Sequence, residues 1–222
     1  MFVIWNRSGE AVYACESIQF AKTQLNGTII LTERNEATTV YCGENDTFYA
    51  VRETIPGEPV YQITEVENVP ENIELAAWEL EDGEIKVNIE KLRASRLAEV
   101  SAACEAAIYE GVDIMTSKGT EHFALTINDQ TNISNLSVAA QSGVAVLYHA
   151  DGELCRVFSP EEMLAVADAA VKYKTYQTTL CNHINAWIRR AETVEELSTI
   201  HYGTPLPKDL AESMAVLLGT EE

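Results

Sequence analysis

Three residue types that can do chemistry lie close together in "YHADGELCRVFSPEEM", residues 148–163: His149, Asp151 and Cys155. A cysteine hydrolase needs a thiolate, an imidazole that takes up its proton, and a group that orients the imidazole. The segment "ELCRVF" lacks the glycines that expose a catalytic thiol in known nucleophile motifs. We therefore expect Cys155 to be a small, buried strand residue. A thiol- or metal-dependent hydrolase using Cys155 and His149 is kept as the enzymatic alternative.

The residues around this segment predict backbone roles for its polar side chains. Asp151-Gly152 between two apolar runs is typical of a hairpin with a two-residue turn, which would pair Cys155 near Leu147 or Tyr148. An aspartate before glycine is expected to accept hydrogen bonds from its own turn backbone.

A helix start follows at once. Ser159 suits the N-cap, Pro160 suits the first helical position, and Glu162 can complete a capping box. Thr193 and Glu196 repeat the same device.

Metal and phosphate motifs are missing from the sequence. The four histidines (His122, His149, His183 and His201) show no H-x-x-x-H or H-E-x-x-H spacing. "NDQTNISN", residues 128–135, lacks the glycine and terminal glutamate of a calcium-binding hand. The glycines are single turn residues, so they form no phosphate cradle. The sequence therefore predicts no catalytic, cofactor-binding or metal-binding residue.

Charge and cysteine content limit the class of partner. The chain has 15 Lys and Arg against 35 Asp and Glu, a formal net charge of −20. Such a surface repels phosphate backbones, so nucleic acid and anionic membranes are not expected partners. No apolar run has the length of a membrane span, and residues 1–13 lack the basic start of a secretory signal. Five cysteines without C-x-x-C spacing predict free, mostly buried thiols in a reducing compartment: Cys15, Cys42, Cys104, Cys155 and Cys181.

Two regions of different composition predict an α+β protein with two domains. Residues 1–85 are rich in β-branched and aromatic residues, and form a β-rich module for attachment or partner binding. Strands are expected at 2–6, 11–15, 28–33, 38–42, 48–53 and 60–67, with one short helix capped by Ser17 and ended by Asn26-Gly27. Breaks are expected at 55–59 and 69–72, and a hairpin turning at Asp82-Gly83 closes the module.

Residues 86–222 are expected to alternate helix and hairpin. The pattern predicts a helix over 88–110 stopped by Gly111, and a hairpin turning around Lys118-Gly119. A helix over about 126–142, opened by Asn128 or Asp129 and stopped by Gly143, precedes the hairpin at Asp151-Gly152. The remaining elements are a long helix to Arg190, a short helix to about His201, and a final apolar helix near 210–218.

The long helix carries the predicted partner-binding residues. Helical spacing places Tyr173, Tyr176 and Trp187 near one face. These side chains either pack against the hairpins or form a partner surface, since Tyr and Trp dominate interface hot spots.

Residues 90–207 resemble a domain-of-unknown-function family found in tail fibre, baseplate and fibre-assembly proteins of tailed bacteriophages. The segments that carry the resemblance are "HFALTINDQTNI", "YHADGELCRVFSPEEM" and "HINAWIRRAETVEELSTIHYGTPLP". The matching positions are Phe123, Leu125, Asp129, Gln130, Asn132, Gly143, Trp187, Thr193, Glu196 and Leu197. They are expected to have structural roles, and the resemblance implies no enzymatic residues.

The resemblance implies a non-enzymatic structural component of a phage tail or baseplate, made in the host cytoplasm and carried in the virion. It would act through contacts with other tail or baseplate proteins, including a receptor-binding fibre, as a homo-oligomer or in several copies. No cofactor is expected. A tail fibre assembly chaperone is the alternative within the same setting.

Overall fold

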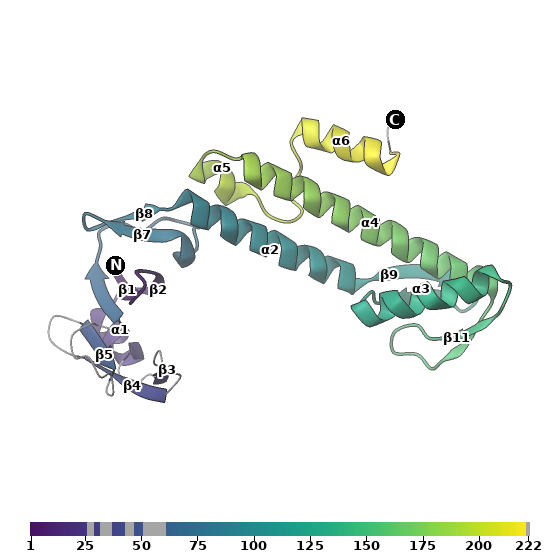
Figure 1. Ribbon diagram of the computed structural model, residues 1–222, viewed down its shortest axis with the longest axis horizontal. Coiled ribbons are helices and arrows are strands. Elements are labelled where there is room, and N and C mark those ends of the chain that lie inside the picture. The colour runs from purple at the N-terminus through teal and green to yellow at the C-terminus, as the bar shows by residue number, and fades with distance from the viewer. Residues whose placement is uncertain (26–28, 32–36, 43–46, 51–60, 221–222) are drawn as a thin grey trace. The chain divides into compact units, whose positions relative to one another are not determined.

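The computed structural model describes residues 1–25, 29–31, 37–42, 47–50 and 61–220 (Figure 1). The chain forms two compact units. The first contains Met1–Ser95 with Glu192–Ser198, and the second contains Arg96–Ala191 with Thr199–Glu222. The predicted α+β class is confirmed, with a strand-rich region followed by a helical one. The predicted division into domains at residue 85 stays a prediction.

The first unit is built on a six-stranded antiparallel sheet with the order β2-β1-β6-β5-β4-β3. Its strands are β1 (Phe2–Asn6), β2 (Ala11–Cys15), β3 (Ile29–Leu31), β4 (Ala37–Cys42), β5 (Thr47–Ala50) and β6 (Tyr61–Glu65). The expected α1 (Ile18–Leu25) is present, and the Ser17 hydroxyl accepts from the Phe20 N–H at 3.3 Å. The predicted helix stop at Asn26-Gly27 and the break at 55–59 lie outside the described residues.

Strand β1 is buried on both faces, which explains its continuous apolar run. Ile4 packs with Ala21 and Leu25 of α1 on one face. Val3 and Trp5 join a cluster on the other face with Ala11, Val66 and Trp78. The register between β1 and β2 shifts between Ile4 and Trp5, so a β-bulge lies at this point.

The hairpin of β7 (Trp78–Glu81) and β8 (Glu84–Val87) follows a single 3-10 turn, η2 (Leu75–Ala77). Glu81 pairs with Glu84 across the turn, and the two turn residues have φ values of 53° for Asp82 and 84° for Gly83. Positive φ at both central residues is the type I′ geometry, so the predicted two-residue turn is confirmed.

The second unit contains the two remaining hairpins and most of the helical residues. Helix α2 (Ile89–Glu110) begins in the first unit and ends in the second. The other elements are β9 (Val112–Thr116), β10 (Gly119–Phe123), α3 (Ile127–Gln141), β11 (Val146–Tyr148), β12 (Arg156–Phe158), α4 (Pro160–Arg190) and α6 (Lys208–Leu218). The short α5 (Val194–Thr199) belongs mainly to the first unit. None of the described helices combines the length and apolar character that a membrane span requires.

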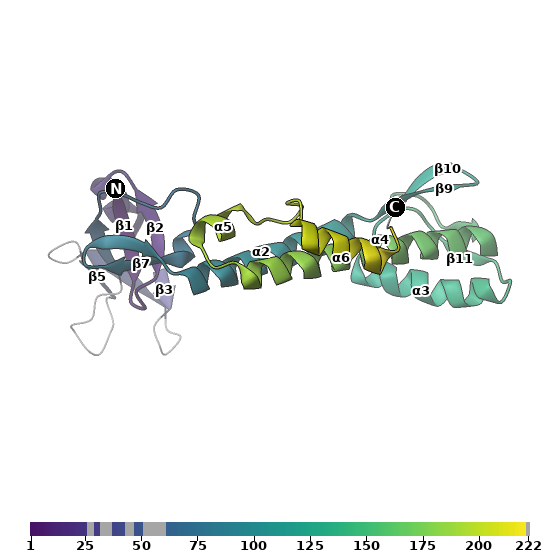
Figure 2. The same cartoon turned by 90° about the horizontal axis from the view of Figure 1, so that it is seen from above.

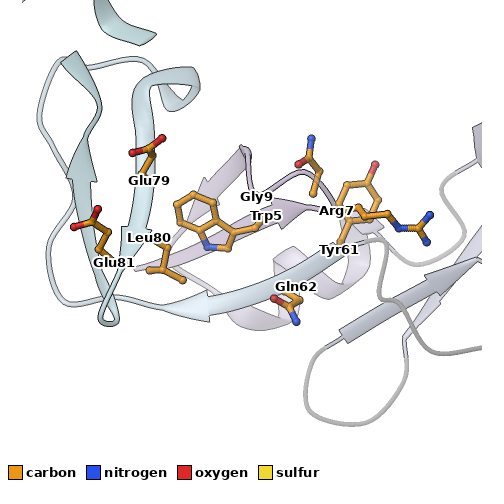
Figure 3. Close-up of a pocket in the computed structure, with 9 residues that line it drawn as sticks. Trp5, Arg7, Gly9, Tyr61, Gln62, Glu79, Leu80 and Glu81 are labelled. Atoms are coloured by element: carbon orange, nitrogen blue, oxygen red, sulfur yellow. The ribbon is translucent and has the colours of Figure 1, made fainter. Parts of the chain in front are cut away.

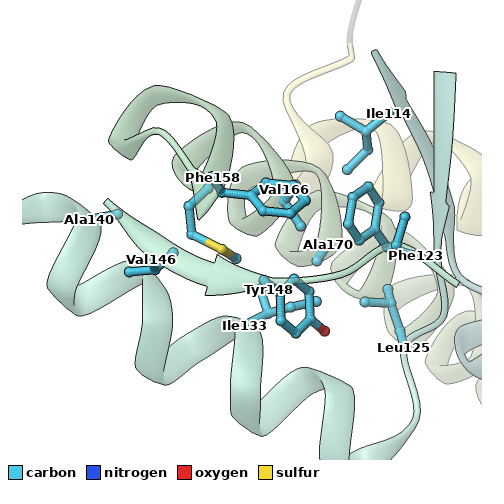
Figure 4. Close-up of a cluster of buried hydrophobic side chains, with 12 residues drawn as sticks. Ile114, Phe123, Leu125, Ile133, Ala140, Val146, Tyr148, Phe158, Val166 and Ala170 are labelled. Carbon is cyan, nitrogen blue, oxygen red and sulfur yellow. The ribbon is translucent and has the colours of Figure 1, made fainter. Parts of the chain in front are cut away.

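The core of the second unit lies between the two hairpins, α3 and α4 (Figure 4). Phe123, Tyr148 and Phe158 form an aromatic group, with ring centroids 6.0–6.2 Å apart. Met163, Val166 and other aliphatic side chains fill the space around these rings. Inward-facing residues of β10, β11 and β12 thus share one core with the helices.

The helix N-termini test the predicted caps. The capping box of Ser159 and Glu162 is present, and Pro160 begins α4 as predicted. Thr193 also caps α5, because its hydroxyl accepts from the Glu196 N–H at 3.1 Å. The predicted range of the third helix, 126–142, agrees with α3, but its predicted cap is wrong: Thr126, and not Asn128 or Asp129, is the N-cap, and Asp129 is the third residue of its capping box.

Helix α4 is the longest helix of the second unit, and α3 and α6 pack along it (Figure 2). The Tyr173 hydroxyl donates to the carbonyl of Ala107 in α2 at 2.9 Å. On α6, the Ser213 hydroxyl lies 3.3 Å from Nε2 of the buried His183.

Candidate functional site

The segment 148–163 does not form a two-residue hairpin. Tyr148 pairs with Arg156, so residues 149–155 make a seven-residue loop between β11 and β12. Asp151 explains the difference, because its partners are in β10 and just beyond. Its N–H donates to the carbonyl of His122 at 2.9 Å, and its carboxylate accepts from the Ala124 N–H at 3.0 Å. Asp151 therefore anchors the loop to the neighbouring hairpin.

The structure places Cys155 outside the strand, and its side chain is exposed. The prediction of a small, buried strand residue was therefore wrong for Cys155, although Cys104 and Cys181 are buried. His149 is also exposed, and its Nδ1 lies 3.0 Å from the carbonyl of the next residue, Ala150. His149, Asp151 and Cys155 thus lie in one loop, and Asp151 bonds to residues of the neighbouring hairpin.

His122, which sequence reasoning passed over, is the histidine that contacts Asp151. Its Nδ1 lies 2.7 Å from Asp113 Oδ1, its Nε2 lies 2.7 Å from the Glu110 carbonyl, and Nε2 lies 3.8 Å from Asp151 Oδ2. The Asp113 carboxylate raises the pKa of His122 above its usual value, and the Glu110 carbonyl adds to this effect. Two acceptors favour the form in which both ring nitrogens carry a proton.

Arg156 is the centre of a second polar network that joins β10, β12 and the start of α4. Its Nη2 lies 2.5 Å from Glu121 Oε2, and its Nη1 lies 3.4 Å from Glu162 Oε2. The guanidinium carbon lies 3.7 Å above the centroid of the Phe158 ring. Thr116 also donates its hydroxyl to Glu121, at 2.5 Å. Most of the surface of these charged side chains is buried, and they link β10, β12 and α4 across the aromatic core.

Glu162 makes the stability of this network depend on pH. Hydrogen bonds from the Ser117 hydroxyl and N–H, and from the Ser159 N–H, lower its pKa to about 2. An unfolded glutamate has a pKa of about 4.3, so the charged form stabilises the fold above that pH and the effect is lost as pH falls through about 2. We expect Glu162→Gln to lower the free energy of unfolding by about 2 kcal/mol near neutral pH, after allowance for solvent screening.

Urea unfolding at a series of pH values measures this difference. The gap between Glu162→Gln and the unmodified chain should close on acidification between about pH 4.3 and pH 2. Glu153→Gln, in the exposed loop, is the matched control and should leave stability unchanged at every pH. A gap that does not depend on pH would contradict the proposed role of the Glu162 charge.

These polar groups connect the two hairpins through hydrogen bonds and ion pairs. The carboxylates of Asp151, Glu121 and Glu162 are occupied by N–H or guanidinium donors. Within the described ranges, no group of three or more His, Cys, Asp or Glu residues could hold a metal ion. We call the bonds of Asp151, and of Arg156 with Glu121 and Glu162, the clamp between the two hairpins.

The β11–β12 hairpin and the residues next to its strands expose four large apolar side chains near this clamp. Leu147 and Val157 face each other across the two strands and are 68% and 62% exposed. Leu154 in the loop is 89% exposed, and Val144 just before β11 is 53% exposed. We call these four residues the hairpin surface. The sequence contains a signal for this surface. Leu147 and Val157 are apolar, whereas the outward positions of a sheet with one solvated face are normally polar.

The three predicted partner residues on α4 differ in exposure. Tyr173 is half-buried, packs against the core of the second unit, and bonds to Ala107. Trp187 is also half-buried, whereas Tyr176 is 47% exposed. Tyr176 therefore presents the most surface of the three, and the partner-binding role of Tyr173, Tyr176 and Trp187 stays a prediction.

The chain matches the family described as "Domain of unknown function (DUF4376)" over residues 91–201, half of its 222 residues. It therefore belongs to this family. The matched range includes β9 to β12, α3, α4 and the whole hairpin surface, whereas the sheet of the first unit lies outside it. No curated protein and no solved structure matches the chain.

Proposed function

We propose that the protein is a non-enzymatic structural component of a bacteriophage tail or baseplate. It would act through protein–protein contacts with a neighbouring tail protein, either a fibre or a baseplate subunit. The observation that carries the proposal is the hairpin surface, whose four apolar side chains are between 53% and 89% exposed. The resemblance of residues 90–207 to phage tail proteins supplies the setting.

The energetics of the hairpin surface favour a protein partner. Burying one exposed Leu or Val side chain contributes roughly 1.5–3 kcal/mol, so four such residues can anchor an interface. The clamp behind the surface fixes the hairpin before a partner arrives, because Arg156 and Asp151 tie β12 and the loop to β10. A pre-ordered surface loses less conformational entropy on binding.

The overall charge suits a component that assembles late. A net charge of −20 keeps the free chain soluble and limits association with other acidic copies. The apolar hairpin surface then supplies a local contact that this general repulsion does not prevent. Several copies on one particle, or a homo-oligomer, are the proposed arrangement.

Leu147→Asp is expected to reduce incorporation into particles by about tenfold or more, because a charge at the centre of the buried contact remains unpaired. The thermal unfolding midpoint should not change, since Leu147 is exposed in the free chain. The measurement is quantitative mass spectrometry of purified tailed-phage particles whose genome encodes the chain. Val171→Asp is the matched control, because Val171 is 65% exposed on α4, outside the hairpin surface.

Two results would contradict the proposal. Absence of the unmodified chain from purified particles would exclude a virion component. If the chain were absent but made a co-expressed fibre soluble, and Leu147→Asp abolished this effect, the protein would be an assembly chaperone. Equal incorporation of Leu147→Asp and Val171→Asp would remove the hairpin surface from the interface.

A further inference from the structure

The first unit contains a pocket that the proposed function does not use (Figure 3). Its volume is about 600 Å³. Trp5 and Gln62 are cross-strand partners in β1 and β6, so their side chains share one face of the sheet and form the floor. Residues from the β1–β2 turn line one side, and Glu79, Leu80 and Glu81 of β7 line the other.

The indole of Trp5 contains a hydrogen-bond donor without a partner. The side chain is 4% exposed, and its Nε1 is a buried atom that meets no acceptor in the described part of the chain. The β-bulge at Ile4 and Trp5 lies at this position, and bulges often re-aim a side chain at a functional site. By contrast, Trp78 in the same cluster donates its Nε1–H to the Ile73 carbonyl at 3.2 Å.

The unpaired nitrogen is directed toward the pocket. In Figure 3 the nitrogen edge of the Trp5 ring faces the space between Leu80 and Gln62. Both of these side chains are exposed, Leu80 by 40%. A ligand atom that accepts a hydrogen bond from this nitrogen would relieve the cost of a buried, unpaired donor.

The two carboxylates that line the pocket are already paired with protein groups. Glu79 accepts from Lys91 at 3.0 Å and from Asn88 at 2.9 Å, and Glu81 accepts from Lys86 at 2.6 Å. Lys91 and Asn88 lower the pKa of Glu79, so its carboxylate stays charged. Because both carboxylates are already paired, they have little net charge left to attract a cationic ligand.

We propose that this pocket binds an uncharged saccharide. A sugar hydroxyl accepts from the Trp5 indole N–H, and other hydroxyls donate to the carboxylates of Glu79 and Glu81. Gln62 can donate and accept at the same ring. The C–H face of the sugar packs against Leu80. A saccharide combines an apolar ring face, alternating donors and acceptors, and no charge, which are the properties that this lining requires.

Binding of the full chain to an array of neutral and anionic glycans tests the proposal, followed by calorimetry with the neutral glycans that bind. Lysine amide is the cationic comparison probe. We expect Trp5→Phe, which keeps an aromatic ring but removes the N–H, to weaken binding by at least about tenfold. Trp78→Phe is the matched control, because it removes an indole N–H from the same cluster outside the pocket, and its affinity should not change.

Gln62→Ala gives a second, independent variant, because it shortens an exposed side chain and leaves the core packing intact. It should weaken binding by roughly five- to tenfold, and circular dichroism melting of each variant checks that the fold is intact. Binding of no neutral glycan, binding of lysine amide or anionic glycans alone, or equal weakening by Trp5→Phe and Trp78→Phe would each overturn the proposal. These outcomes are independent of whether the chain is found in phage particles.

Discussion

Replacing Phe158 with alanine is expected to lower the free energy of unfolding of the second unit by about 3–5 kcal/mol. Phe158 is fully buried, and its ring meets those of Phe123 and Tyr148 at 6.0 and 6.1 Å between centroids. The guanidinium of Arg156 lies over one face of the ring. Truncation therefore removes a large apolar side chain, leaves a cavity between the hairpins and α4, and also removes the support beneath the polar clamp.

Hydrogen exchange of the amides in α3 and α4, resolved by mass spectrometry, measures this effect in the second unit alone. Val157→Ala is the matched control, because Val157 precedes Phe158 in β12 and is 62% exposed. It should change protection by less than about 0.5 kcal/mol. If Phe158→Ala cost no more than Val157→Ala, the aromatic group would not be the core that joins the two hairpins.

Gly111→Ala is expected to destabilise the same unit by about 2–4 kcal/mol. Gly111 follows α2 with φ at +88°, a conformation that side chains with a Cβ adopt at a cost. A Cβ built at this position would lie 2.1 Å from the carbonyl oxygen of Phe123. Because that oxygen belongs to the backbone of the neighbouring hairpin, the clash cannot be relieved by a side-chain rotation.

Gly143→Ala separates the two causes of this effect. Gly143 lies just after α3 with φ at +77°, but a Cβ there would meet no atom within 4 Å. It should therefore show the conformational cost alone, about 1 kcal/mol. Thermal unfolding of both variants gives the comparison, and equal losses would show that β10 does not pack closely against Gly111.

Polar residues of the segment 148–163 join the two hairpins of the second unit. Asp151 reaches across to the end of β10, and Arg156 reaches to Glu121 within β10. These bonds leave Leu147, Leu154 and Val157 on the outside of a fixed hairpin. The polar residues thus order the apolar surface through which we propose that the protein contacts its neighbour.

The elements of the fold could be predicted from the sequence wherever the signal is local. The cap of α4 depends on Ser159, Pro160 and Glu162, which lie within four residues of one another. The type I′ turn at Asp82-Gly83 is equally short in range. In both places the residues that interact are close neighbours in the chain, so their residue types and spacing are enough to predict the interaction.

The start of α3 shows how a local signal can be misassigned. Thr126, Asn128 and Asp129 are all acceptable N-caps by residue type, and the choice among them depends on where the backbone turns. The preceding residue, Leu125, is fully buried in the core, which fixes the entry of the chain into the helix. Packing therefore selected Thr126, and Asp129 took the reciprocal position in the box.

The sequence by itself determined the α+β class, the order of the elements and most helix boundaries, because caps, turns and apolar periodicity act between residues a few positions apart. Only the tertiary structure decided the partners of Asp151, His122 and Arg156, which bond across 27, 9 and 35 residues. It likewise left Trp5 with an unpaired donor at a pocket. Such contacts depend on how separate elements pack, and the spacing of residues along the chain does not specify which distant residues will meet.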